Sequence, residues 1–186
     1  MIGKLWLDEH ARALIEHEAA KRPRRETGGA LFGYEHDDHL VVACAYGPGP
    51  RAKHRRASFE PHPATTSLLM DAVRGASEAR YRYLGSWHTH PGGPARPSGQ
   101  DIATTENVSG EPDVLLDRPL LLIQATRPRG RAAEIHELRA WRWESEISWV
   151  MPVEIVSVNL TGERYCPVVQ LPAGRRGRNH VLTSDV

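Results

Sequence analysis

Apolar residues recur along the chain at two spacings, one typical of helices and one typical of strands. The helical spacing predicts a helix over about residues 9–21 behind Asp8, a possible N-cap, and a second helix over 64–80. Ser98 to about Asn107 predicts a short third helix. The side chains expected on one face of the first two helices are Ala11, Leu14, Ile15, Glu18, Leu68, Leu69, Ala72, Val73 and Ala76.

Short apolar runs between these helices predict strands. They lie at 29–34, 40–46, 81–88, 118–126, 132–143 and 151–160, and the first two are joined by the polar turn Glu-His-Asp-Asp. The basic segment 47–56 predicts a loop. Helices interleaved with strands, without an internal repeat, favour an α/β domain with one mixed, twisted sheet flanked by helices.

Composition narrows the class of protein. A length of 186 residues suits one domain with a sizeable core. The 24 lysines and arginines nearly balance the 23 acidic residues, so the whole chain makes no case for nucleic acid. We see neither a signal peptide nor an apolar spanning run, and therefore expect a cytoplasmic protein without membrane contact.

The two cysteines, Cys44 and Cys166, are far apart in the sequence and have no ligand spacing. We expect no disulfide framework, as in a reducing compartment. Cys44 lies in an apolar run and is expected in the core.

Chemistry-bearing residues are concentrated in Ser-Trp-His-Thr-His-Pro-Gly-Gly-Pro-Ala-Arg-Pro-Ser-Gly-Gln-Asp, residues 86–101. At a strand end His88 and His90 point to the same side, with Thr89 facing away. Ser98 and Asp101 share one face of the following helix. Two imidazoles and a carboxylate leave a fourth position for water, which is the pattern of a catalytic zinc site.

Each part of this pattern also has an ordinary explanation. A His-x-His pair is common on surfaces, and Ser98 and Asp101 could simply cap a helix and complement its dipole. Their joint spacing favours the metal site over these separate explanations.

The spacing His-Thr-His-Pro, six residues, Ser98, two residues, Asp101 resembles the JAMM motif of the MPN-domain metalloproteases, His-x-His-Pro-x6-Ser-x2-Asp. That family also carries an upstream Glu-x-Gly-Gly-x-Leu-x-Gly, and residues 26–33 match it throughout. The residues alone do not distinguish Glu26 from other glutamates such as Glu18, Glu35 or Glu60. The glycines at 28 and 29 are expected to let the backbone approach the metal loop or a substrate.

The resemblance covers roughly residues 5–145 and is to the compact prokaryotic type. It implies an MPN (JAMM) catalytic domain of cytidine-deaminase-like architecture over residues 1–150, followed by an extension over 151–186, partly strand and then a flexible tail. It also implies one Zn²⁺ per chain, held by His88, His90 and Asp101. Glu26 would move the proton and Ser98 would hydrogen-bond the oxyanion.

By the same resemblance, the activity is cleavage of the amide after the C-terminus of a ubiquitin-like protein. The partners implied are that protein or its conjugate and E1-like and E2-like proteins, in a bacterial conjugation or antiphage operon. Alternatives are a processing protease for a sulfur-carrier-type precursor and a non-catalytic MPN scaffold, although the intact motif argues against a scaffold. A nucleobase deaminase would need His-x-Glu and Pro-Cys-x-x-Cys, and this sequence has neither.

Overall fold

The computed structural model describes residues 3–112, 114, 116–160, 166–171 and 180–182. The helices are α1 (Glu9–Ala20), α2 (Pro63–Ala76) and α3 (Gly99–Ser109). The strands are β1 (Leu5–Asp8), β2 (Gly28–His36), β3 (His39–Ala45), β4 (Lys53–His54), β5 (Phe59–Glu60), β6 (Arg82–Pro91), β7 (Leu120–Arg129), β8 (Ala132–Glu144), β9 (Trp149–Val153), β10 (Ile155–Val158), β11 (Val169–Leu171) and β12 (His180–Leu182).

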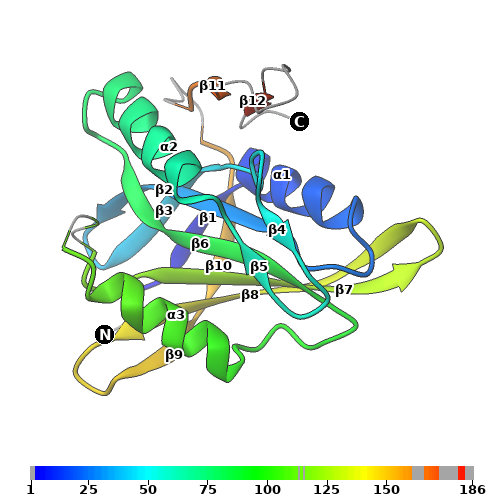
Figure 1. Ribbon diagram of the computed structural model, residues 1–186. Coiled ribbons are helices and arrows are strands. Elements are labelled where there is room, and N and C mark those ends of the chain that lie inside the picture. Colours follow the sequence, from blue (N-terminus) through cyan, green and yellow to red (C-terminus); the bar gives the residue numbers. More distant parts are fainter. Residues whose placement is uncertain (1–2, 113, 115, 161–165, 172–179, 183–186) are drawn as a thin grey trace.

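Eight of these strands form one sheet, in the order β10-β1-β3-β2-β6-β7-β8-β9. The sheet contains both parallel pairs (β1 with β10 and β3, β6 with β7) and antiparallel pairs, which confirms the mixed sheet. Only Glu154 separates β9 from β10, yet these strands pair at opposite edges. The sheet therefore curls until its two edges lie side by side (Figure 1).

The predicted final strand is in fact two strands, one added to each edge of this sheet. The domain boundary at residue 150 stays a prediction. The flexible tail predicted at 172–180 lies outside the described residues, apart from His180.

Helix α1 packs against β3, β7 and β8, on the inner face of the curl. It begins as predicted behind Asp8, whose buried carboxylate accepts the His10 N–H at 3.1 Å. Ala11, Leu14 and Ile15 are buried among strand residues from both halves of the sheet, whereas Glu18 is only half-buried.

Helix α2 covers the opposite face of β2 and β3, so both faces of these strands are buried. The helix ends at Ala76, not at residue 80. Its buried stripe is Thr65, Leu69 and Val73, spaced four residues apart, while Leu68 stays 39% exposed. The predicted face was too wide, because Leu68 and Ala76 are exposed, whereas Ala72 packs against the same cluster as Leu69 and Val73.

Cys44 forms a disulfide with Cys166, a bond that the expectation of no disulfide framework did not include. A separation of 122 residues in sequence did not keep them apart, because residues 166–171 return to the face of β3 beneath α2. There Tyr46 donates its hydroxyl to Pro167 O at 2.7 Å, and Val169 is buried in the same cluster as Leu69. The burial of Cys44 is confirmed.

None of the helices in the described part of the chain is both long and apolar enough to cross a membrane.

Candidate metal centre

The end of β6 presents two imidazoles on one side. Strand β6 is held between β2, where His88 faces Gly28, and β7, where His88 faces Ile123. The Nε2 atoms of His88 and His90 lie 3.0 Å apart, which confirms that residues i and i+2 converge here. Thr89 faces the other side and is buried.

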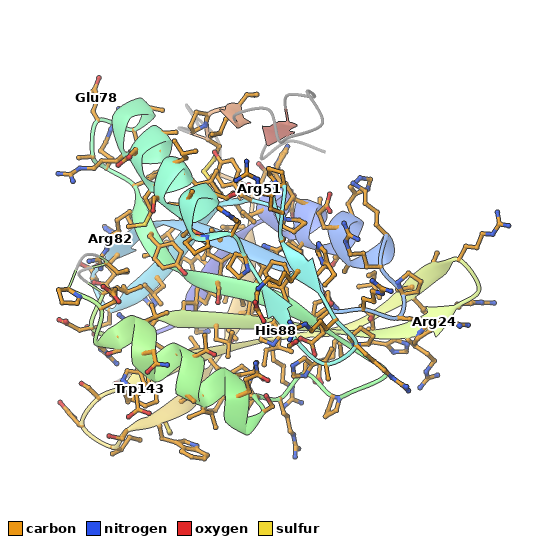
Figure 2. All side chains as sticks on the ribbon, viewed as in Figure 1. Arg24, Arg51, Glu78, Arg82, His88 and Trp143 are labelled. Atoms are coloured by element: carbon orange, nitrogen blue, oxygen red, sulfur yellow. A yellow bond between two sulfur atoms is a disulfide. The ribbon has the colours of Figure 1, made fainter. Side chains whose placement is uncertain are left out.

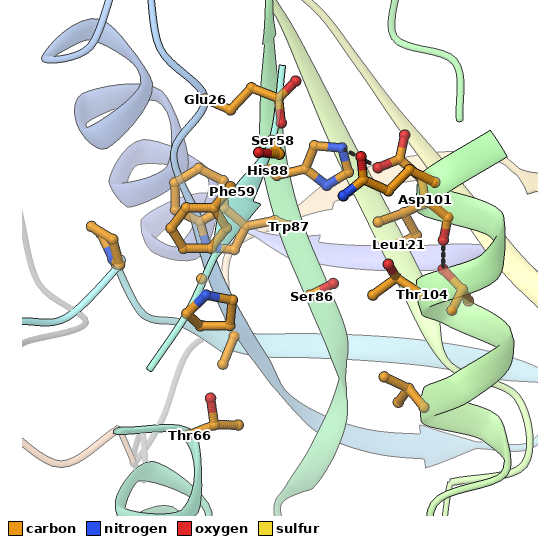
Figure 3. A pocket seen from close by; sticks show the side chains of 18 of the residues that line it. Glu26, Ser58, Phe59, Thr66, Ser86, Trp87, His88, Asp101, Thr104 and Leu121 are labelled. Atoms are coloured by element: carbon orange, nitrogen blue, oxygen red, sulfur yellow. Dashed lines mark hydrogen bonds and ion pairs between the residues drawn. The ribbon is translucent and has the colours of Figure 1, made fainter. Parts of the chain in front are cut away.

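Asp101 joins them from the first turn of α3. Its Oδ1 lies 3.2 Å from His88 Nε2 (Figure 3). Its Oδ2 lies 3.4 Å from His90 Nε2. The three side chains are only 10 to 15% exposed. Residues that sequence spacing placed on a strand end and a helix start therefore meet at one point.

This cluster fits a divalent metal ion. Tetrahedral zinc with bonds of about 2.0–2.1 Å holds its ligand atoms roughly 3.3 Å apart, close to the separations found here. Among the described residues, His88, His90 and Asp101 form the one group of three His, Cys, Asp or Glu side chains with that convergence.

His90 is already oriented for metal binding. Its Nδ1 lies 2.9 Å from Pro94 O, so in the neutral ring that nitrogen donates its proton and Nε2 has a lone pair for a metal. The loop that carries Pro94 is itself anchored, since Trp141 Nε1 donates to Ala95 O at 3.3 Å. A backbone carbonyl thus sets both the tautomer and the ring orientation.

Electrostatics keeps Asp101 ionised. Burial favours the neutral acid, but the hydrogen bonds from His88 and His90 outweigh it and hold the pKa of Asp101 far below its usual range. Burial likewise opposes the charged form of His90, yet the hydrogen bond to Asp101 raises the pKa of that imidazole. The carboxylate is a ready ligand at neutral pH.

Glu26 lies two residues ahead of β2, beside these ligands (Figure 3). Its N–H donates to Arg55 O at 2.8 Å, and its carbonyl oxygen lies 2.9 Å from His54 Nδ1. Burial raises the pKa of the Glu26 carboxyl, although the two metal-site histidines lower it in part. A carboxylate with a raised pKa is suited to taking and returning a proton near neutral pH.

The other candidate glutamates lie elsewhere and are paired. Glu18 pairs with Lys21 at 2.6 Å, and Glu60 pairs with Lys53 at 2.7 Å. Glu35 bonds Arg82 and Arg142. Only Glu26 of the four lines the cavity at the metal ligands.

Ser98 is the N-cap of α3 and is engaged with Asp101. Its hydroxyl donates to Asp101 Oδ2 at 2.7 Å and accepts the Asp101 N–H at 3.2 Å. The Ser98 N–H also donates to Asp101 Oδ2 at 2.7 Å, which completes a capping box. Ser98 therefore positions a ligand, and its role toward an oxyanion stays a prediction.

A cavity of about 160 Å³ leads away from the proposed metal ligands along β6, between α3 and the β4–β5 hairpin and on toward α2 (Figure 3). Its lining includes the small residues Gly29, Ala30 and Ser86 as well as the aromatic Phe59, Tyr83 and Trp87. Thr104 of α3 and Thr66 of α2 stand on opposite sides (Figure 3). The groove suits a slender chain.

Gly28 lies against the proposed metal site, as expected, since it pairs with His88 and a Cβ on it would lie 2.9 Å from His88 Cβ, and Gly29 lines the cavity. A Cβ on Gly28 would lie 2.3 Å from Trp87 O, and one on Gly29 would lie 1.8 Å from Tyr46 O. The glycines permit close strand packing, since only a residue without a side chain fits there.

Two features of the site were missed in the sequence. The segment predicted as a basic loop contains β4, which pairs with β5 to form the hairpin wall beside Glu26. The Thr27 N–H donates a hydrogen bond to Thr89 Oγ1, although the two residues are 62 positions apart in the sequence. Two-residue strands and long-range hydrogen bonds leave no periodic pattern, so local spacing could not reveal them.

Two histidines, one aspartate and a neighbouring glutamate on a curled α/β sheet define a metal-dependent hydrolase type of site. Residues 7–144, well over half of the chain, match the family described as prokaryotic homologs of the JAB domain, Prok-JAB. The chain belongs to this family, which confirms the resemblance and the single MPN-like domain.

Curated relatives agree with that assignment. The chain is similar to a CD-NTase/cGAS isopeptidase of Pseudomonas aeruginosa, with 33% identity over 52% of this chain and 61% of that protein. It is also similar to a probable metalloprotease of Sinorhizobium fredii, with 26% identity over 67% of this chain and 77% of that protein. The first match thus spans less than two thirds of the relative's length.

A solved structure supports the fold alone. A protein of Desulfitobacterium hafniense, known from its solution structure, superposes with a TM-score of 0.59 at 18% identity and covers 84% of this chain and 94% of its own.

Proposed function

We propose that this protein is a zinc-dependent isopeptidase that cleaves the amide after the C-terminus of a ubiquitin-like protein. The observation that carries the proposal is the convergence of His88, His90 and Asp101 beside a carboxylate with a raised pKa, Glu26. The relatives named isopeptidase and metalloprotease support a peptidase.

His88 Nε2, His90 Nε2 and an oxygen of Asp101 would hold one zinc ion. Zinc bound there would supply a Lewis acid and lower the pKa of water toward about 7. Glu26 takes the proton from the attacking water and then gives it to the amine nitrogen, so the lysine side chain leaves as a neutral amine. The Ser98 hydroxyl donates to the oxygen on which negative charge develops.

The substrate tail lies in the groove along β6. A flexible, extended tail with glycines at its end can pass over Gly29, Ala30 and Ser86, where a larger side chain would collide with the walls. The edge of the β4–β5 hairpin offers backbone groups that can pair with the tail.

The names of the relatives support a class for the protein to which the tail is attached. Since three of them are named CD-NTase/cGAS isopeptidase, from Pseudomonas, Enterobacter and Escherichia, we include an enzyme of the CD-NTase class as the protein released. E1-like and E2-like partners, an antiphage operon, a catalytic domain over residues 1–150 and a cytoplasmic location belong to the same proposal.

The test is cleavage of a synthetic substrate in which a tail ending in Gly-Gly is joined to the Nε of a lysine. Zinc-loaded protein should release the tail, and the Glu26→Gln variant should not. Substituting a bulky residue for the penultimate glycine should abolish cleavage. A linear fusion cleaved in preference to the isopeptide would favour precursor processing. No cleavage of either by zinc-loaded protein would contradict the proposal.

A further inference from the structure

Several arginines lie on one side of the proposed catalytic centre. Three segments contribute them: the loop before Glu26, the turn of the β4–β5 hairpin and the tip of the β7–β8 hairpin. We name this surface the basic rim, and its members are Arg24, Arg25, Arg55, Arg56, Arg127, Arg129 and Arg131. All seven are exposed.

The segments form one surface. An open hollow of about 540 Å³ is lined by Lys21, Arg22, Pro23, Arg24 and Arg25 together with Gly130 at the β7–β8 tip. The backbone bond from Glu26 N to Arg55 O ties the β4–β5 turn to the same loop. Figure 2 shows Arg24 at the end of the molecule where the β7–β8 hairpin lies.

The charges of the basic rim are largely unneutralised. Arg55 lies 3.6 Å from Glu60, but within the described chain no carboxylate pairs with Arg24, Arg25, Arg56, Arg127, Arg129 or Arg131. Glu134 lies opposite Arg127 in the β7–β8 hairpin, but its carboxylate pairs with His136 at 3.9 Å. Burial is the main cause that lowers the pKa of His54; Arg22 and Arg25 lower it further, while the hydrogen bond to the Glu26 carbonyl and the charge of Glu18 raise it.

The rim and the groove leave the metal ligands in different directions. The groove extends along β6 to Thr66 and Leu69 of α2. In Figure 2, His88 lies between α2 and Arg24. A tail that fills the groove with its final carbonyl at the metal ligands therefore delivers the other half of the amide, the lysine and its protein, over the basic rim.

We propose that the basic rim docks an acidic face of the protein that carries the cleaved lysine. The inference rests on the proposed function for the direction of the substrate. Complementary charge would steer the conjugate to the site and raise its association rate. Such steering does not require close shape complementarity between the two surfaces.

A protein partner fits this surface better than a nucleic acid. The segments read Lys-Arg-Pro-Arg-Arg, Arg-Arg and Arg-Pro-Arg-Gly-Arg, with no aromatic residue among them. Single-stranded nucleic acids are held by aromatic stacking as well as by charge.

The experiment compares two isopeptide substrates with the same Gly-Gly tail, one with glutamates and one with lysines flanking the modified lysine. At an ionic strength of about 0.15 M, the wild type should prefer the acidic substrate by roughly tenfold in kcat/KM, because charge attraction at contact distance survives this screening. In Arg24→Ser/Arg129→Ser the ratio should fall to about 1. Arg51→Ser/Arg74→Ser changes net charge equally, away from the rim, and should keep the wild-type ratio.

Binding separates this inference from the proposed activity. Fluorescein-labelled peptides with the two flanking sequences are titrated into Glu26→Gln protein, which needs no turnover. Tighter binding of the acidic peptide, lost in the rim variant and kept in the control, supports the rim even if no substrate is cleaved. Equal binding of both peptides overturns it. Oligothymidylate that displaces the acidic peptide at one tenth of its concentration would also overturn it, in favour of nucleic acid.

Discussion

Thr27 and Thr89 hold each other by two hydrogen bonds. The Thr27 N–H donates to Thr89 Oγ1 at 3.0 Å, and the Thr89 N–H donates to Thr27 O at 2.8 Å. Glu26 is the residue before Thr27, and Thr89 stands between His88 and His90. One reciprocal pair thus links the proposed proton carrier to the proposed metal ligands.

Thr89→Val should therefore disturb catalysis without removing a catalytic group. Valine keeps the shape but leaves the buried Thr27 N–H without an acceptor, at a cost of about 1–3 kcal/mol in unfolding free energy. Small misplacement of Glu26 should lower kcat by roughly tenfold or more. Urea unfolding and kcat measure the two effects. Thr89→Ser keeps the hydroxyl and should restore both; a valine variant with wild-type kcat would contradict the link.

Metal content tests the ligand set directly. Purified protein should hold one zinc per chain, and His88→Ala or Asp101→Ala should lose most of it, because two remaining donors bind zinc weakly. Elemental analysis after dialysis provides the measurement. His136→Ala, at an exposed histidine of β8, is the matched control and should retain zinc. Wild-type protein that takes up no zinc when it is added would refute the site.

Glu26→Gln should abolish cleavage while zinc and fold are kept. General acid–base groups contribute about 10²–10⁴ in rate, and Glu26 acts in two steps. Cleavage rate and zinc content are measured together. A variant that cleaves at nearly the wild-type rate would mean that another carboxylate moves the proton.

We expect the same variant, Glu26→Gln, to be stabilised relative to wild type by an amount that depends on pH. Burial raises the pKa of Glu26 in the folded protein above its unfolded value, so the fold favours the protonated acid. In metal-free wild type this lowers the unfolding free energy as pH rises from about 4.5 through the raised pKa. Glutamine does not ionise, so the melting temperature of Glu26→Gln relative to wild type should be higher at pH 7 than at pH 4. A constant difference would count against a raised pKa.

The disulfide predicts that wild-type protein has no thiol that reacts with iodoacetamide under denaturing conditions without reductant. Cys166→Ser should lower the unfolding free energy by up to about 4–5 kcal/mol, since the bond closes a long loop. Val168→Ala, on the exposed side of the same segment, should have little effect. Mass spectrometry and urea unfolding measure these outcomes. Two alkylated cysteines in unreduced protein would rule out the bond.

Local periodicity predicted what depends on neighbours in sequence. Helix α1, strands β2 and β3, and the convergence of His88 with His90 follow from spacings of two to four residues. The placement of β9 and β10 at opposite edges and the pairing of Cys44 with Cys166 depend on how the sheet curls, which no local pattern records. Glu26 was found only because residues 26–33 resemble a family motif; its charge and spacing resemble those of other glutamates.

Ser98 has two proposed roles, in capping α3 and in the reaction, and substitutions can distinguish them. Its hydroxyl caps α3 and also donates to Asp101 Oδ2, at the edge of the proposed metal site. If the hydroxyl also stabilises the oxyanion, Ser98→Ala should lower turnover by about 10²–10³ with zinc retained. Loss of the cap should lower the unfolding free energy by about 1 kcal/mol.

Ser98→Gly distinguishes these effects, because glycine at an N-cap costs only a few tenths of a kcal/mol yet also lacks the hydroxyl. If the hydroxyl acts on the reaction, the glycine and alanine variants should lose turnover equally while differing in stability. If Ser98 only caps the helix, the glycine variant should stay nearly as active and as stable as wild type. Steady-state kinetics and thermal unfolding of the two variants, each checked for zinc, therefore decide whether Ser98 belongs with Glu26 in the reaction or only with Asp101 in the fold.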